Sequence, residues 1–415
     1  MAAPPRFVAP EPTGWWIALV RAALPLLLRG IGIRSIHYSG GELDRYRGMA
    51  RDRVLIVPNH PTNADPAILF HLGATARTVP YFLACRESFD AWFGAWGWCI
   101  RRLGAYSLVR GTTDRPSFKA TRDLLSGQGN HVVVFPEGEV YSQNDSLLPY
   151  HEGPFQLAFW ALESARRTAP DATILVQPVA VKYFLAGISQ RAVRASLARL
   201  ENHVKAPTGP SDDDYDRLRA IAWSMLRSLE REYRIPFPDE DDWHREFDTR
   251  LRTVKEAILS RVSAAVGIDP PAKATLPERM RALIHALEVV TAEGNDESSP
   301  YEHQLHRIQR DRARPLLKDL ERLATFIAVH DGYVAENPTL ERLCDTLVRL
   351  ERECFGRTFL RRSFRVRVAL LEPIDLSAWL AEYTTNRSDC LSRLVRSIES
   401  GTLAALRALE PPTVA

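Results

Sequence analysis

VLIVPNHPTNADP, residues 54–66, indicates the fold class and contains the first groups of chemical interest. Its four leading apolar residues, three of them β-branched, run into proline, asparagine and histidine, which is typical of a buried strand that ends in a loop. Asp65 and Pro66 then form a good helix start, with the carboxylate at the N-cap and proline at N1. The stretch predicts a strand, a short turn and a helix.

Similar apolar runs follow residues 54–66 at intervals filled by helical patterns. They are VPYFLAC at 79–85, GAYSLV at 104–109, HVVVFPEG at 131–138 and ILVQPVAVKY at 174–183. Buried strands that alternate with helices predict an α/β domain, in which helices flank a mixed sheet.

After residue 196 the strands give way to amphipathic helical patterns at 212–233, 241–262, 277–290 and 339–354, the last of which ends at Gly356. FRVRVALLEPIDL at 364–376 then returns to strand-like alternation, and a final helix is expected near 389–409. We therefore predict an all-helical insertion in the α/β domain, with an N-terminal segment at 1–50, the α/β domain at 51–196, the insertion at 197–360 and the closing strand and helix at 361–415.

Composition narrows the function classes. The chain has 415 residues, 45% of them apolar and 25% charged, which is typical of an ordered globular protein. A net charge of +3 argues against nucleic-acid binding but suits anionic lipids or an acidic carrier. Five scattered cysteines show no metal-binding or disulfide spacing, so we expect a reducing, cytoplasmic location, no metal site and no cofactor.

The segment from Trp15 to Ile33 is the most hydrophobic near the start, but Arg21, Pro25 and Arg29 make it unsuited to spanning a bilayer. Paired tryptophans beside leucines and arginines fit a helix lying in the membrane interface, and equally a helix that caps the core. An aromatic cluster at 89–98 has the same two interpretations: contact with lipid or an acyl chain, or burial in the core.

His60 and Asp65 are five positions apart across the expected turn, so their side chains are within reach of each other. A carboxylate that accepts from one imidazole nitrogen fixes the tautomer and leaves the other nitrogen basic, as a general base requires. The alternative is that Asp65 only caps the helix and His60 only fills space.

A second motif, Phe135-Pro136-Glu137-Gly138, directly follows the strand HVVVF. The ordered pair of motifs, His-x-x-x-x-Asp and then Phe-Pro-Glu-Gly, resembles the glycerophospholipid acyltransferase family, which includes lysophosphatidic acid acyltransferases. The resemblance covers only the α/β part of the chain.

The resemblance implies roles for seven residues. His60 is the catalytic base and Asp65 its orienting partner, while the acceptor is held by the substrate-binding residues Arg110, Glu137, Gly138, Arg86 and Pro178. An arginine fork after a strand suits a phosphate, and a glycine allows close backbone approach. For Arg110 a surface salt bridge is the alternative, and Glu137 is expected to bind acceptor hydroxyls or backbone amides, or else to cap the next segment.

The family commonly continues its second motif with Thr-Arg-Ser, whereas this chain reads Glu139-Val140-Tyr141. A carboxylate in place of a cation disfavours a phosphate monoester, so zwitterionic, glycolipid and aminolipid acceptors stay open.

These features predict a peripherally membrane-associated enzyme of phospholipid biosynthesis. It moves a fatty acyl group from acyl-CoA or acyl carrier protein to a hydroxyl of a lysophospholipid or related glycerolipid, and backbone amides near the helix start stabilise the oxyanion. The competing hypothesis is a non-catalytic lipid-binding protein whose helical module contacts a partner.

Overall fold

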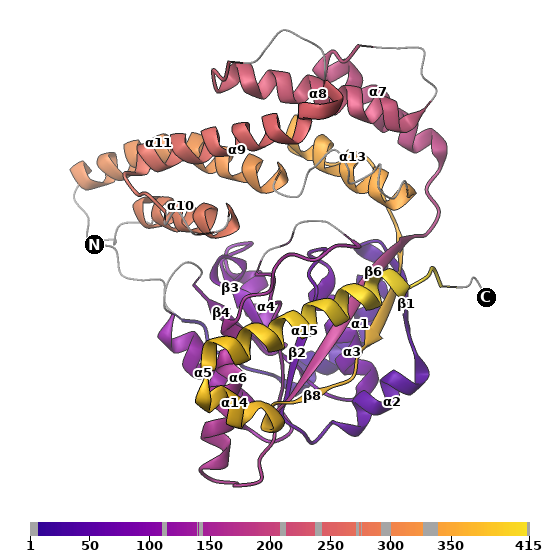
Figure 1. The fold of residues 1–415 in the computed structure, drawn as a ribbon, viewed down its shortest axis with the longest axis vertical. Coiled ribbons are helices and arrows are strands. Elements are labelled where there is room, and N and C mark those ends of the chain that lie inside the picture. The colour runs from indigo at the N-terminus through magenta and orange to yellow at the C-terminus, as the bar shows by residue number, and fades with distance from the viewer. Residues whose placement is uncertain are drawn as a thin grey trace. The chain divides into compact units, whose positions relative to one another are not determined.

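The computed structural model describes residues 7–109, 114–138, 140, 144–207, 213–236, 243–270, 274, 276–291, 300–326 and 339–412. The chain divides into two compact units. The α/β unit combines Pro5–Ala186 with Arg362–Ala415, and the helical unit is built on Gly187–Arg361 (Figure 1). The predicted fold class, an α/β domain interrupted by an all-helical segment, is confirmed.

The α/β unit is organised around one eight-stranded sheet of order β1-β7-β6-β2-β5-β3-β4, in which β8 also pairs with β6. All pairs are parallel except β6 with β7 and β6 with β8. The strands are β1 (Ile33–Tyr38), β2 (Val54–Pro58), β3 (Tyr81–Cys85), β4 (Ala105–Leu108), β5 (His131–Val133), β6 (Leu175–Leu185), β7 (Phe364–Leu370) and β8 (Ile374–Asp375).

Alternation along the strands separates two hydrophobic cores. In β2, Val54 and Ile56 belong to one core, whereas Leu55 and Val57 belong to the other. Because successive side chains of a strand point to opposite faces, a strand buried on both faces must be apolar throughout. This explains why β2 is recognisable from its sequence alone.

Helices cover both faces of the sheet, as Figure 1 shows. The first face carries α1 (Gly14–Gly30), α2 (Gly40–Gly48), α3 (Asp65–Ala76), η1 (Arg86–Phe89) and α4 (Ala95–Arg102). The second carries α5 (Arg115–Ser126), α6 (Gly153–Arg166), η2 (Leu376–Trp379), α14 (Leu380–Thr385) and α15 (Arg387–Ala408). The helix that begins at Asp65 therefore lies on the first face.

The N-terminal segment contributes more than the one helix expected. After α1, the chain forms β1 at the edge of the sheet and then α2. In α1, Ile17, Leu24 and Leu28 are buried in the first core, while Trp15 and Leu26 are exposed. Within the described ranges, no helix combines the length and apolar character needed to cross a membrane.

The helical unit contains α7 (Gln190–Val204), α8 (Asp214–Glu232), α9 (Trp243–Val266), α10 (Leu276–Thr291), α11 (Pro300–Phe326) and α13 (Leu340–Phe355). Glu351 of α13 is fully buried and links the first helix of this unit, α7, to the segment that follows its last helix. The Glu351 carboxylate accepts hydrogen bonds from Ser196 Oγ at 2.7 Å and Arg199 Nη1 at 3.0 Å on α7. It also accepts from the backbone amides of Phe359 at 2.6 Å and Leu360 at 2.9 Å.

The insertion begins and ends at neighbouring strands. Leu185, the last residue of β6, pairs with Phe364, the first residue of β7. The Ala186 amide donates to the Ser363 carbonyl at 2.7 Å. The boundary expected between residues 196 and 197 falls inside α7, because the amphipathic helix starts earlier, at Gln190.

Candidate active site

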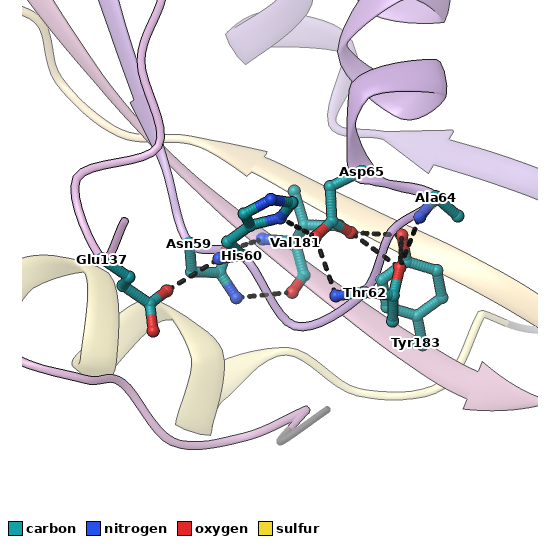
Figure 2. Close-up of polar contacts among 8 residues, drawn as sticks. All are labelled: Asn59, His60, Thr62, Ala64, Asp65, Glu137, Val181 and Tyr183. Carbon is teal, nitrogen blue, oxygen red and sulfur yellow. Dashed lines mark hydrogen bonds and ion pairs between the residues drawn. The ribbon is translucent and has the colours of Figure 1, made fainter. Parts of the chain in front are cut away.

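The turn between β2 and α3 brings His60 and Asp65 together. His60 Nδ1 lies 2.7 Å from Asp65 Oδ2, where the Asp65 side chain is fully buried and that of His60 is 13% exposed. β2 ends at Pro58 and α3 starts at Asp65, so His60 lies in the six-residue turn between them and Asp65 is the first residue of the helix that follows. Figure 2 shows the imidazole directed at the carboxylate.

The Asp65 carboxylate accepts four hydrogen bonds. Oδ2 accepts from the Thr62 amide at 2.8 Å as well as from His60, and Oδ1 accepts from Thr62 Oγ1 at 3.1 Å and from the Tyr183 hydroxyl. Burial, and then the Asp65 charge, raise the pKa of Tyr183 well above its ordinary value, so Tyr183 remains a phenol that donates. Four donors fix the orientation of a charge that has no access to water.

This arrangement fixes the tautomer of His60. An ionised carboxylate only accepts, so Nδ1 must carry the proton that it shares with Asp65, and Nε2 is left with its lone pair. The ring stacks on Phe135 with centroids 3.9 Å apart and planes 19° apart. No described side chain hydrogen-bonds to Nε2. The site therefore presents an oriented base.

Glu137 supports the same turn from the second motif. Its Oε1 accepts from the His60 amide at 2.7 Å and its Oε2 from the Leu148 amide at 2.9 Å. Burial raises the pKa of Glu137 to about 7, although these two backbone hydrogen bonds act in the opposite direction. Both carboxylate oxygens of Glu137 thus accept backbone amides, and the hydrogen bond from His60 connects the two motifs.

Two asparagine side chains extend the hydrogen bonding of β6 into this region. Asn59 donates to the Val181 carbonyl at 3.0 Å and accepts from the Val181 amide at 2.7 Å. Asn144 accepts from the Tyr183 amide at 2.7 Å and donates to the Tyr183 carbonyl. Each amide group replaces a missing backbone partner, so the loops carrying His60 and Leu148 are both held on one strand.

Most backbone amides of the turn are already engaged. Those of His60, Thr62, Ala64 and Asp65 donate to acceptors within the site. The Gly138 amide donates to the Phe135 carbonyl at 3.1 Å. Among the described residues of this turn, only Asn63 has an amide without an acceptor, and the expected oxyanion site stays a prediction.

The remaining predicted residues occupy different places. Arg86 starts η1 and forms an ion pair with Asp90 at 2.7 Å. Pro178 is buried in β6 opposite Val57 of β2. Gly138 adopts a left-handed conformation with φ 72°, which favours glycine. Arg110 lies outside the described residues. Substrate binding by these four stays a prediction.

Several residues of the site are not evident from the sequence. Tyr183 and Thr62 hold Asp65, and Asn59 and Asn144 hold the two loops. Thr62 lies inside the first motif and Asn59 directly before it, so their positions in the sequence could have indicated them. Tyr183 and Asn144 lie far from His60 in the sequence, and nothing near them indicated a role in the site. In the described part of the chain, no three His, Cys, Asp or Glu side chains gather as a metal-binding group.

A family model matches part of the chain. Residues 42–182 match the family model described as Acyltransferase. The match runs from α2 into β6 and covers about a third of the 415 residues, including both motifs. It ends one residue before Tyr183, and neither β7 nor the helical unit falls within it. No curated protein matches the chain.

Proposed function

Residues 42–182 form an acyltransferase-family domain, and on that premise we propose that the protein transfers a fatty acyl group from an acyl thioester to a hydroxyl of a lysophospholipid or related glycerolipid. The observation that carries the proposal is the His60–Asp65 hydrogen bond of 2.7 Å, which leaves Nε2 as an oriented base inside this domain. The proposed acyl donor is acyl-CoA or acyl carrier protein.

The proposed reaction needs no covalent enzyme intermediate. His60 Nε2 takes the proton from the acceptor hydroxyl as its oxygen attacks the thioester carbonyl. The tetrahedral intermediate then collapses, the carbon–sulfur bond breaks, and the proton on Nε2 passes to the leaving sulfur. The products are one ester and one thiol. Asp65 stays ionised and stabilises the imidazolium that forms between the two steps.

The surrounding groups support this role for His60. Phe135 covers one face of the imidazole, and Asp65 holds its edge. Glu137 fixes the backbone of His60 itself through the amide. A base held by its ring and by its main chain has little freedom to reorient, which keeps Nε2 aimed at the acceptor.

Recognition of the acceptor is assigned by the family resemblance. We propose that Arg110 and Arg86 contact its polar head and that Gly138 allows the backbone of the second motif to approach it. Glu137 is proposed to act by positioning the turn, because both of its carboxylate oxygens already accept backbone amides. The backbone amide of Asn63 is the candidate donor to the oxyanion.

The test is thiol release from palmitoyl-CoA by the purified protein, with a panel of lysophospholipids and glycolipids as acceptors and mass spectrometry of the products. His60→Ala is compared with wild type. The control is His71→Ala, which removes a histidine of α3 whose imidazole hydrogen-bonds to the Tyr38 hydroxyl at 2.9 Å. Circular dichroism checks that each variant is folded.

Acceptor-dependent release that is lost in His60→Ala and kept in His71→Ala supports the proposal and identifies the acceptor. If palmitoyl-CoA gives no release, acyl carrier protein thioesters are tried next. Full activity of folded His60→Ala would contradict the assigned base. Absence of product with both donor classes, together with measurable lipid binding, would favour a non-catalytic lipid-binding protein.

A further inference from the structure

The α/β unit has an exposed apolar surface that the proposed chemistry does not use. We call it the tryptophan face, and it consists of Trp15, Leu19, Leu26 and Leu27 of α1 with Trp92, Phe93, Trp96 and Trp98 in and before α4. Solitary exposed apolar side chains are common on protein surfaces, but eight large ones from two segments are not.

The outward side of α1 carries several large apolar residues. Trp15, Leu19 and Leu26 follow helical spacing, and Leu26 is 71% exposed. The opposite side places Ile17 and Leu24 in the core. A helix at the surface of a water-soluble protein normally turns charged residues outward. The outward side of α1 therefore fits an apolar environment.

The second segment presents its aromatic rings through an unfavourable backbone. Trp92 and Phe93 have φ of 52° and 57°, in the left-handed region that aromatic residues seldom adopt. The result is that Phe93 is fully exposed and Trp92 is 77% exposed. The Trp92 ring also meets the Trp96 ring edge-on, with centroids 5.9 Å apart, and backbone strain of this kind is characteristic of functional positions.

Specific contacts join the two segments into one surface. Trp16 Nε1 donates to the Cys99 carbonyl at 3.2 Å, and the Trp16 ring packs edge-on against Trp98 with centroids 5.2 Å apart. The Thr13 amide, just before α1, donates to the Arg102 carbonyl at 3.0 Å. The aromatic rings of both segments are thus held together before any partner arrives.

Two ion pairs lie beside this surface, Arg101 with Glu11 and Arg86 with Asp90, each at 2.7 Å, and within the two segments themselves the charged residues are positive. Between residues 14 and 31 the only charged residues are Arg21 and Arg29, and between 91 and 104 they are Arg101 and Arg102. The Arg102 guanidinium lies 4.1 Å from the centre of the Trp98 ring. Tryptophan rings beside arginine, around a leucine stripe, suit the boundary between lipid headgroups and acyl chains.

We propose that the tryptophan face docks the protein on the surface of a bilayer that contains anionic lipid. Docking does not require acyl transfer, but the purpose assigned to it, the supply of a lipid acceptor, rests on the proposed function. α1 packs against α3, which begins with Asp65, and Arg21 donates to the Thr78 carbonyl just after α3 at 2.6 Å. The docking surface and the dyad thus belong to the same face of the sheet, which suits delivery of a lipid acceptor from the docked bilayer.

Vesicle sedimentation tests the docking. Wild type is mixed with vesicles of equal parts phosphatidylcholine and phosphatidylglycerol, and in parallel with phosphatidylcholine alone. The test variant is Trp92→Ser with Phe93→Ser, which changes only exposed side chains. The control is Trp160→Ser, an exposed tryptophan on α6 at the other face of the sheet. We expect at least about tenfold weaker partitioning of the test variant and no change in the control.

Other outcomes overturn the proposal. Wild type that sediments with neither vesicle, or equally with both, contradicts docking on anionic lipid, and so does equal partitioning of the test variant. A dimer in light scattering that the test variant abolishes would assign the surface to a second copy of the chain instead.

Activity assays on acceptors in vesicles and in detergent distinguish a loss of docking from a loss of catalysis. The test variant is expected to lose activity on acceptors in vesicles and to keep it on acceptors dispersed in detergent, whereas His60→Ala binds vesicles normally and is inactive on both. Equal loss of activity in detergent would count against a docking role for residues 92 and 93. Failure of wild type to turn over any acceptor while still binding vesicles would contradict the proposed function and leave docking intact.

Discussion

Replacing Tyr183 with phenylalanine tests whether the site depends on a fixed Asp65 carboxylate. The change removes only the hydroxyl, which donates to Asp65 Oδ1 and lies 3.0 Å from Thr62 Oγ1. The ring keeps its edge-on packing against Phe364, with centroids 5.5 Å apart. No cavity larger than one oxygen atom is created, so any effect should report the lost hydrogen bond.

The magnitude follows from the number of donors. A hydrogen bond to a buried charge contributes about 1.5–3 kcal/mol. Thr62 Oγ1 still donates to Oδ1 at 3.1 Å after the change, so we expect a loss at the low end, about 1.5 kcal/mol in the free energy of unfolding. Oδ2 keeps both His60 and the Thr62 amide, so the expected fall in kcat/KM is about tenfold, or ~1.4 kcal/mol.

Urea unfolding and the thiol-release assay measure the two effects. Tyr106→Phe is the matched control, because Tyr106 is also fully buried and bonds to Thr121 Oγ1 at 2.8 Å, in the core on the other face of the sheet. It should lose about 1 kcal/mol of stability and no activity. Because Tyr183→Phe with Thr62→Val leaves Oδ1 without a donor, the double variant should lose more than the sum of the two single losses.

If Tyr183→Phe behaves like Tyr106→Phe in turnover, Asp65 needs no support from β6 and the role assigned to the Tyr183 hydroxyl is refuted. Activity as low as that of Asp65→Asn would also refute it, because the hydroxyl would then belong to the reacting groups and not to their support.

Three further outcomes are expected. Burial raises the pKa of Glu137 from 4.5 to about 7. Relative to Glu137→Gln, the wild type should therefore lose roughly 3 kcal/mol in the free energy of unfolding in urea as pH rises from 4.5 to 7; a constant difference would contradict this. Burial lowers the pKa of His131 from 6.5 to about 4, so its effect on stability changes with pH in the opposite direction. Its contribution is complete above pH 6.5 and falls as pH decreases, so relative to His131→Gln the wild type should lose about 2 kcal/mol between pH 7.5 and pH 5. Glu351→Ala should lower the stability of the helical unit by about 3–5 kcal/mol by leaving its donors unpaired, seen as faster amide exchange at 356–361, and unchanged exchange there would contradict that role.

The sheet could be predicted where burial on both faces makes a strand apolar throughout. β2 is of this kind, and β5, β6 and β7 were also expected from their sequences. β1, with the sequence IRSIHY, mixes arginine, serine and histidine with apolar residues because it lies at the edge and is only partly buried. Its pairing with β7 joins segments more than three hundred residues apart, and no local pattern encodes that.

The site could be predicted where its contacts are short in sequence. His60 and Asp65 are five residues apart, and the predicted contact between them is present. Tyr183 meets Asp65 across a separation of 118 residues, and Glu137 meets the His60 amide across 77. These contacts depend on the order β6-β2-β5 in the sheet, which a single sequence does not reveal. One side of the N-terminal helix α1 is buried in the core, and the interfacial role expected for its exposed side stays a prediction.

The position of the helical unit between β6 and β7 makes it an oversized hairpin loop. Ser363 donates through its hydroxyl to the Ala186 carbonyl at 3.0 Å and accepts the Ala186 amide through its own carbonyl, so the two strands need only a short turn to be connected. The entropy of closing a loop grows slowly with its length, and the register of the two strands is set by their own pairing. Residues of this loop can therefore be gained, lost or exchanged in evolution without a change in the strand order of the sheet. A shortened chain that joins Ala186 to Arg362 through a two-residue turn is a natural starting point for asking what the α/β unit does alone.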